Sequence, residues 1–552
     1  MARFTLCILV MLLPNLVLGQ SWRSVDQDVF ARSIERQMAG RVMGFAFAVA
    51  DRDGIVAEAS GGWAQARGDG DLPMDTDVVI NFGSNQKVLS GVALLDLLEE
   101  RGFSLEQEVQ TRFTLFMPDK WREFYFSGNT QSLFDRITLR DLLDHTSGLA
   151  DEPPDNLVHD QGTKIGWSLT QPVQTNELNN NTGDYNNNNF TLLLYAIPNL
   201  FYRSETNSLE AEAAALSRPS DYNGFAAREY GALYTRYMKE EFLPRVPVEL
   251  DGGTCFSEDL QHGRVAKQYQ NRTSRRGDFG FATGFCRSQG SWSYSVRDMA
   301  HIMRTIELDD AIIKRSTRGL YPASTTPRMI FWRSFSHRWL AKNTRVDTYR
   351  GHGGRTPPAA NNGRSNSVTI RLPFGHVGVA AVNSDEMNAN TLGPVLLNAF
   401  YEATRKTFEK DVSRGGSDIA DFDLSDPDPE VCRNRCNDRS NCRSWTYVPP
   451  GIQDPTNARC WLKSGIPAQS VRAGRISGVK GLEYGWDRPG SDLRTFAISN
   501  GDPAACFVRC AFDRNCKAYT FVGAGVPGQG GQCWLKSRVP PRKRASCCIS
   551  GK

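Results

Sequence analysis

Ser84 and Lys87 have the residue types and the spacing of a serine nucleophile and its base. The apolar run from Val88 to Leu98 predicts a largely buried helix that begins near Ser84. Residues three apart lie on the same side of a helix. A serine hydroxyl is a poor nucleophile until it loses its proton, and a nearby neutral amine can accept that proton. The free N–H groups of the helix N-terminus would stabilise a developing oxyanion. The S-x-x-K spacing also occurs by chance, and Lys87 taken alone is better explained as a solvated helix lysine.

Two later segments contain residues suited to the same chemistry. Tyr185 and Asn187 are the first and third residues of a Y-N-N segment that precedes an apolar, helix-like run. His352, Gly353 and Gly354 precede two strand-like segments, and glycines let a substrate backbone approach closely. Taken singly, Tyr185 could be an ordinary half-buried tyrosine. We expect His352 to contact substrate rather than act as an acid or base.

The elements that must position these residues are strands at both ends of the first 404 residues, with helices between them. The predicted strands cover residues 44–50, 55–60, 367–372 and 376–383. The predicted helices cover residues 84–101, 137–149 and 392–408. This order predicts an α/β fold in which the terminal strands share one sheet. His145, near the end of the second helix, is expected to hold the following loop rather than act as a base.

Four signatures occur in order: S-x-x-K, then L-L-x-H-T-S-G-L, then Y-x-N, then H-x-G with a following T-P. Together they resemble the serine β-lactamase-related family over residues 25–405. That family includes class C β-lactamases, D-Ala-D-Ala carboxypeptidases, D-aminopeptidases and related esterases. The resemblance implies an α/β (α+β) domain of the β-lactamase/transpeptidase type, with an antiparallel sheet flanked by helices. It also implies hydrolysis of a peptide, amide or ester bond through an acyl-enzyme.

The resemblance implies a role for each matched residue. Ser84 would be acylated, and Lys87 and Tyr185 would form a proton relay in which Tyr185 activates the deacylating water. Asn187 would orient Lys87 and the substrate amide. The backbone N–H groups of Ser84 and Arg355 would form the oxyanion hole. The residues expected to contact the substrate or its oxyanion are His352, Gly353, Gly354 and Arg355.

Two features depart from the family's pattern. Pro358-Ala359-Ala360 follows the T-P pair where relatives usually have a glycine, and an asparagine-rich run at residues 179–189 crowds the expected cleft. Both features bear on whether a substrate can enter the cleft, and neither bears on the chemistry of Ser84. The alternative function is a catalytically silent extracellular binding or structural protein built on the same fold, because a fold does not fix a function.

The tail contains a repeat of cysteines. Of the 13 cysteines, ten follow residue 430, and three of them recur 74 positions later, so that 432, 436 and 442 match 506, 510 and 516. A C-W-L-K-S segment at 460–464 recurs at 533–537. Two copies of one small module therefore follow the large domain, and each is expected to need two cross-links because its core is marginal. Four cysteines allow three pairings, between which the spacing does not choose.

Both copies resemble the apple/PAN family, which binds proteins or carbohydrates. The pairings that this resemblance implies are Cys432–Cys460, Cys436–Cys442, Cys506–Cys533 and Cys510–Cys516. The family's third disulfide has no counterpart in the first copy, and the partners of Cys547 and Cys548 stay open. Cys255 and Cys286, the two cysteines of the large domain, are expected to pair with each other.

Residues 1–20 have the layout of a secretory signal peptide, with an apolar run too short for a membrane span. An exported protein that is not integral to a membrane agrees with the dense cysteines. The expected domains are a hydrolase domain at 21–404, a polar linker at 405–415, and modules at 416–480 and 490–552.

The net charge of +4, from 65 basic and 61 acidic residues, gives no reason to expect nucleic acid as a partner. The seven histidines are scattered without ligand spacing, so neither a metal nor a cofactor is expected. Three sequons make Asn180, Asn189 and Asn271 the candidate glycosylation sites.

Overall fold

The computed structural model describes residues 25–101, 112–126, 131–151, 161–175, 185–256, 264–280, 286–309, 311–314, 328–329, 332–338, 346–372, 375–404, 408–424, 429–523 and 530–552. The expected signal peptide and the sequon at Asn180 lie outside these residues. None of the helices within these ranges has the length and apolar character that crossing a membrane requires.

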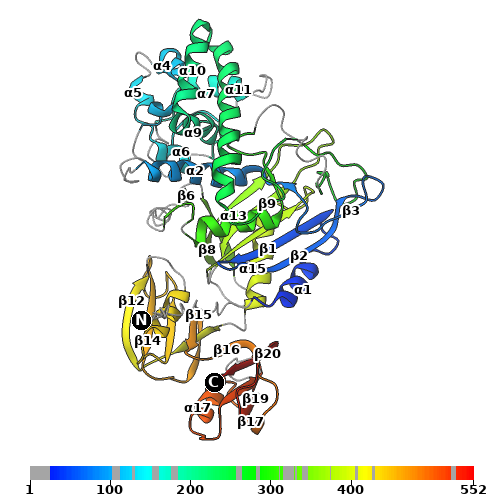
Figure 1. Cartoon of the computed structure of the whole chain (residues 1–552), viewed down its shortest axis with the longest axis vertical. Helices are drawn as coiled ribbons and strands as arrows, with labels where there is room; N and C mark the ends of the chain where they lie inside the picture. The colour runs from blue at the N-terminus through cyan, green and yellow to red at the C-terminus, as the bar shows by residue number, and fades with distance from the viewer. Residues whose placement is uncertain are drawn as a thin grey trace, which may run out of the picture.

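Within the described residues, eight strands form one antiparallel sheet at the centre of the large domain (Figure 1). Its strands in spatial order are β3 (Leu72–Pro73), β2 (Gly54–Gln65), β1 (Gly44–Asp51), β10 (His376–Val382), β9 (Asn366–Leu372), β8 (Val346–Arg355), β7 (Trp332–Arg338) and β6 (Arg328–Met329). Strand β1, the first along the chain, pairs with β10, the last, from Phe45 opposite Val382 to Ala50 opposite Val377. The terminal strands therefore share one sheet, as the sequence predicts.

Strand β1 is buried on both faces, and its alternating side chains divide between two cores. The odd-numbered residues from Phe45 to Val49 belong to the same apolar cluster as helices α1 and α15, whereas the even-numbered alanines belong to the cluster of α2 and α13. Alanine on that face leaves room for the helices to approach. The covering helices are α1 (Gln27–Met38), α15 (Ala389–Thr404), α2 (Gln86–Glu100) and α13 (Val296–Leu308).

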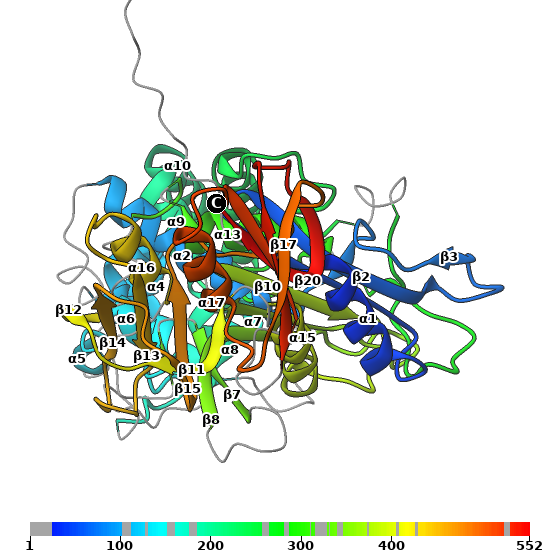
Figure 2. The same ribbon diagram turned by 90° about the horizontal axis from the view of Figure 1, so that it is seen from below.

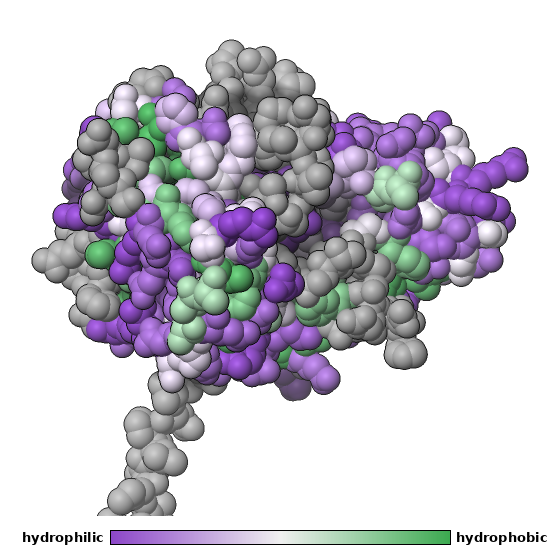
Figure 3. Space-filling model, turned by 90° about the horizontal axis from the view of Figure 1, so that it is seen from above, coloured by the Kyte–Doolittle hydropathy of each residue, from purple (hydrophilic) through white to green (hydrophobic). Residues whose placement is uncertain are grey.

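The middle of the chain forms a helical region at the top of Figure 1. Seen from above, the described residues at this end are mostly hydrophilic, with only scattered hydrophobic patches (Figure 3). The helical elements here are η2 (Phe113–Phe116), α4 (Asp119–Phe124), α5 (Gln131–Phe134), α6 (Leu139–Asp144), α7 (Gln161–Thr170), α8 (Asn187–Thr191), α9 (Leu193–Phe201), α10 (Arg203–Glu212), η4 (Ala213–Ala215), α11 (Pro219–Tyr237), η5 (Met238–Phe242) and η6 (Leu243–Arg245). Separate from the eight-stranded sheet, β4 (Ile80–Asn81) and β5 (Ser293–Tyr294) form a short antiparallel pair.

Helix α6 is shorter than the predicted helix at 137–149. It ends at His145, which has a left-handed φ of 60° and so turns the chain out of the helix before Gly148 is reached.

Each C-terminal module is a five-stranded antiparallel sheet with one helix, and Figure 2 views the molecule from their side. The first contains β11 (Glu409–Arg414), β15 (Gln469–Val479), β13 (Ser444–Val448), β14 (Ala458–Lys463), β12 (Asp418–Leu424) and helix α16 (Pro429–Asn437). The second contains β16 (Glu483–Asp487), β20 (Lys543–Gly551), β18 (Ala518–Val522), β19 (Gly531–Lys536), β17 (Asp492–Ile498) and helix α17 (Pro503–Ala511).

The expected module boundaries are wrong at both starts. The segment 405–415 was expected to be a linker, but β11 pairs with β15 in the sheet of the first module. The second module likewise begins with β16, before the expected start at 490. The segment 405–415 looks like a linker because it is polar, yet its charged residues are paired inside the module, Arg414 with Glu409. In the second module Arg488, the residue directly after β16, pairs with Glu483 in the same way.

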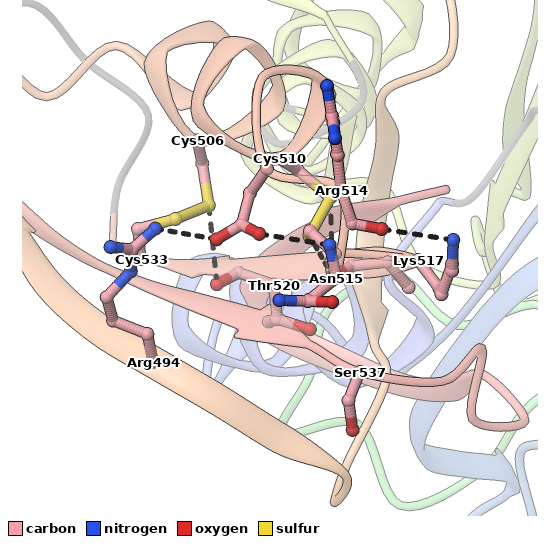
Figure 4. The surroundings of a disulfide bond; sticks show 12 residues. Arg494, Cys506, Cys510, Arg514, Asn515, Lys517, Thr520, Cys533 and Ser537 are labelled. Atoms are coloured by element: carbon pink, nitrogen blue, oxygen red, sulfur yellow. Dashed lines mark hydrogen bonds and ion pairs between the residues drawn. A yellow bond between two sulfur atoms is a disulfide. The ribbon is translucent and has the colours of Figure 1, made fainter.

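The structure pairs the cysteines as expected. The disulfides are Cys255–Cys286, Cys432–Cys460, Cys436–Cys442, Cys506–Cys533 and Cys510–Cys516, and Cys547 bonds to its neighbour Cys548. Figure 4 shows how Cys506 joins α17 to Cys533 on the sheet below it, and how Cys510 secures the end of the same helix. These cross-links compensate for the small core of a module of this size.

Candidate active site

Ser84 lies in the 3₁₀ turn η1 (Gly83–Asn85), which continues directly into α2. The turn is fastened to the central sheet by Asn85, whose fully buried side-chain amide lies 2.8 Å from both Ser367 Oγ and Thr369 Oγ1 on β9. This contact fixes Ser84 between the sheet and the helical region. The sequence analysis missed Asn85; its signal is a polar residue facing the sheet from the start of an apolar helix.

Gly83 lets the turn approach strand β8 closely. Its φ is +53°, and a side chain at this position would place Cβ only 2.8 Å from the backbone nitrogen of Arg355. The backbone of Ser84 is therefore next to that of Arg355, the pair expected to supply the oxyanion hole. The Arg355 side chain points elsewhere, since its guanidinium pairs with Asp385 at 2.7 Å.

Lys87 is fully buried, and its amine lies at the centre of the site. Nζ is 3.0 Å from Ser84 Oγ, donates to the carbonyl of Gln289 at 2.7 Å, and lies 5.0 Å from the centroid of the Tyr185 ring. Residues from three separate parts of the chain thus meet at this amine. The Gln289 contact was missed because a backbone carbonyl leaves no residue-type signature in a sequence.

Tyr185 is positioned by His145. The two rings lie 4.5 Å apart, and Nδ1 of His145 accepts the backbone N–H of Asn186 at 3.1 Å, where helix α8 begins. The side chain of Asn186 caps that helix by accepting the N–H of Asn188 at 2.7 Å. His145 therefore orients the segment that contains Tyr185, whereas the sequence analysis expected it to hold the loop after its own helix.

Among the described residues, Asn187 makes no hydrogen bond to Lys87. Its backbone N–H donates to Asp151 at 2.7 Å, and among the described residues the hydrogen-bond partners of the Lys87 amine are Ser84 and Gln289. The expectation that Asn187 orients Lys87 is therefore not met.

His352 is buried and is not among the residues that line the cleft beside Ser84. Its side chain is 1% exposed, its ring centroid lies 6.3 Å from that of Tyr185, and Nδ1 is 2.8 Å from the carbonyl of Gly353. The His352 ring therefore lies inside the fold, and its expected contact with substrate stays a prediction. His352 supports the wall behind Tyr185.

The two glycines after His352 serve a packing role. A Cβ on Gly354 would lie 1.9 Å from the carbonyl of Phe82, and one on Gly353 would lie 2.4 Å from Cβ of Ala389. The missing side chains therefore let β8 pack against the turn before Ser84 and against the start of α15. Both glycines also line the cleft.

The cleft beside Ser84 has a volume of about 250 Å³ and is open to solvent. Its lining is largely polar, and much of it comes from residues that the sequence analysis did not single out. The lining residues are Ser84, Tyr185, Gly353, Gly354, Arg355, Asn366, Asn388, Ala389 and Asn390. A cleft of this size admits a small acyl group next to the Ser84 hydroxyl.

The described residues correct one glycosylation site. Asn189 is 1% exposed and accepts a hydrogen bond from Ser147 at 2.5 Å, so it is too enclosed to carry a glycan. Asn271 lies in a turn at the surface, where its side-chain oxygen accepts the N–H of Thr273 at 3.0 Å. Within the described ranges, no three His, Cys, Asp or Glu side chains are grouped to hold a metal ion.

Comparison with protein families agrees with this division of the chain. The family model described as Beta-lactamase matches residues 30–391, well over half of the sequence. The model described as PAN domain matches residues 412–463 and 486–536, one segment in each module. No curated protein matches the chain.

Several solved structures are similar to the chain. An octameric penicillin-binding protein homologue from Pyrococcus abyssi is 17% identical, with a TM-score of 0.48, over 77% of this chain and 83% of that one. A class C beta-lactamase from Rhodobacter sphaeroides is 15% identical, with a TM-score of 0.45, over 68% and 98%. A D-amino acid amidase from Ochrobactrum anthropi is 16% identical, with a TM-score of 0.42, over 69% and 97%.

Proposed function

The chain belongs to the beta-lactamase family and has two PAN domains at its C-terminus, and from this premise we propose that it is a secreted serine hydrolase. It would cleave a peptide, amide or ester bond through an acyl-enzyme on Ser84. The observation that carries the proposal is the 3.0 Å contact between the Ser84 hydroxyl and the buried amine of Lys87 at the edge of an open cleft. The PAN domains would hold the enzyme on a protein or glycan surface.

The reaction begins with transfer of the hydroxyl proton of Ser84 to the neutral form of the Lys87 amine. The oxygen attacks the substrate carbonyl, and the N–H groups of Ser84 and Arg355 stabilise the oxyanion of the tetrahedral intermediate. Its collapse leaves the acyl group on Ser84, while the leaving group takes a proton delivered through Lys87 and Tyr185. Water activated by Tyr185 then releases the acid and restores the serine.

The polar cleft supports small, polar acyl groups as substrates. Asn366, Asn388 and Asn390 line it together with the backbone of β8, so amide and hydroxyl groups on the substrate would find partners there. Six disulfides among the described residues support export to an oxidising compartment.

A substrate panel tests the proposal: a p-nitrophenyl ester, a D-Ala-D-Ala peptide and amino acid amides. We expect turnover of at least one class by the full chain, its loss in Ser84→Ala, and no change in Ser208→Ala, which replaces an exposed serine of α10. A well-folded chain that turns over none of these would instead support the silent binding protein, for which the favouring observation is that, among the described residues, Lys87 hydrogen-bonds to Ser84 and Gln289 and not to Asn187.

A further inference from the structure

The two PAN domains contain the same buried ion pair at equivalent positions. In the first, Arg414 donates from Nε and Nη2 to Glu409, both at 2.6 Å, and from Nη1 to the carbonyl of Pro467 at 2.6 Å. In the second, 74 positions later, Arg488 donates from the same two nitrogens to Glu483 at 2.9 and 2.8 Å. Its Nη1 donates to the carbonyl of Pro540 at 2.7 Å, which completes the match.

The first arginine has one more partner. Asp502 of the second domain accepts from Nη1 of Arg414 at 3.1 Å and from Nη2 at 2.7 Å, a two-pronged contact. Asp502 is the N-cap of α17, whose N–H at Ala504 it also binds, and Pro503 follows it. The second domain thus contacts the first through an aspartate at the start of a helix, Asp502, which binds Arg414.

The second arginine lacks this partner. Among the described residues, nothing accepts the two remaining N–H groups of Arg488, although its side chain is only 5% exposed. Buried N–H groups without acceptors are costly, which favours a ligand that supplies them. A second arginine, Arg542, also lies at this site, with its guanidinium 3.7 Å from Glu483.

The surface around Arg488 differs from its counterpart in one more way. Trp486 stands where the first domain has Val412, and the guanidinium of Arg542 lies 4.5 Å from its ring centroid. Tryptophan and arginine are both enriched at the centre of protein interfaces, so the pair of Trp486 and Arg542 is consistent with a docking surface here.

We propose that Arg488 is a docking site for a protein partner that presents an aspartate at the N-terminus of a helix. The aspartate would accept the two remaining N–H groups of Arg488 as Asp502 accepts those of Arg414. A protein aspartate is favoured over an acidic sugar because the one occupant of the sister site is an aspartate of this kind. The proposal does not depend on the chemistry of Ser84.

The test uses the full chain and a fluorescent peptide that copies residues 499–511 with serine in place of its two cysteines. The sister site at Arg414 does not compete, because Asp502 already occupies it within the same chain. Fluorescence anisotropy should show saturable binding. Replacing the aspartate of the peptide with asparagine should weaken binding about tenfold or more, since a charge-assisted pair is lost.

Variants of the chain locate the site. Arg488→Lys keeps the positive charge but loses the planar guanidinium that can donate two parallel hydrogen bonds, and it should weaken binding by about tenfold. Arg542→Gln introduces the residue that the first domain has at this position, Gln469, and should weaken binding severalfold while leaving the ion pair of Arg488 with Glu483 in place. Arg494→Gln, at an exposed arginine of the same domain, is the matched control and should bind as the wild type does.

The proposal is overturned if the wild-type chain fails to bind the peptide at about 1 mM, the weakest affinity of interest. It is also overturned if the aspartate and asparagine peptides bind equally, or if neither Arg488→Lys nor Arg542→Gln changes the affinity. Competition by free glucuronate at concentrations equal to those of the peptide would assign the site to an acidic glycan instead.

Discussion

Replacing Gly83 with alanine tests whether the close approach of the Ser84 turn to β8 forms the oxyanion site. The φ of +53° is strained for alanine, and the added Cβ would lie 2.8 Å from the nitrogen and 2.9 Å from the carbonyl carbon of Arg355. Both atoms are backbone, so no side chain can rotate away. The turn and the strand must separate instead.

The size of the effect follows from these contacts. The left-handed conformation costs an alanine about 1–2 kcal/mol. To lengthen the 2.8 Å separation between the new Cβ and the Arg355 nitrogen to an ordinary contact distance of about 3.5 Å, the turn must move away from β8 by about 0.5 Å or more. Because a displacement of about 1 Å can cost about 10²-fold in rate, we expect acylation of Gly83→Ala to slow by about tenfold.

The assay is the second-order rate of labelling by a fluorophosphonate probe, with thermal unfolding to verify the fold. Gly290→Ala is the matched control: its Cβ would lie 3.4 Å from the carbonyl of Gly83, an ordinary contact, so its rate should stay near that of the wild type. Gly354→Ala, with its 1.9 Å contact to Phe82, should be affected more than Gly83→Ala. A folded Gly83→Ala protein that labels at the wild-type rate would refute the reasoning.

Three further predictions follow from single contacts. Lys87→Met should slow labelling by about 10²–10⁴-fold, the usual contribution of a general base, while circular dichroism shows an unchanged fold. Replacing Cys255 and Cys286 with serine opens a loop closed over 31 positions and should lower the free energy of unfolding by about 3–4 kcal/mol in denaturant titrations. Burial raises the pKa of Asp96 to about 6 despite its ion pair with Arg245. Since the unfolded chain releases this proton at lower pH, stability should fall between about pH 4 and pH 6, and Asp96→Asn should flatten that part of the curve; an unchanged pH profile in the variant would contradict the assignment.

The sequence predicts those features that leave a periodic or repeated pattern. The apolar run after Lys87 predicts α2, the apolar segments at 44–50 and 376–383 predict paired strands, and the repeated cysteines predict two copies of one module. Each of these depends on burial of apolar side chains or on a covalent constraint, both of which residue types record directly.

Other features depend on contacts that residue types do not record. The carbonyl of Gln289 reaches Lys87 from 202 positions away, and no side-chain pattern marks it. The burial of His352 depends on which face of β8 meets the inside of the fold. Strand β11 was mistaken for a linker because its charged residues are neutralised by each other and by Asp502, a partner that only the tertiary structure brings near.

The most direct test of the central claim, that one hydroxyl, one amine and one phenol act around a single cleft, is the position of a covalent adduct. The full chain is incubated with a fluorophosphonate, its intact mass is measured, and the modified peptide is mapped. The account predicts one adduct per chain, on Ser84, formed much more slowly when Tyr185 is replaced with phenylalanine or Lys87 with methionine. A folded chain that forms no adduct, or that forms it on another serine, would contradict the account.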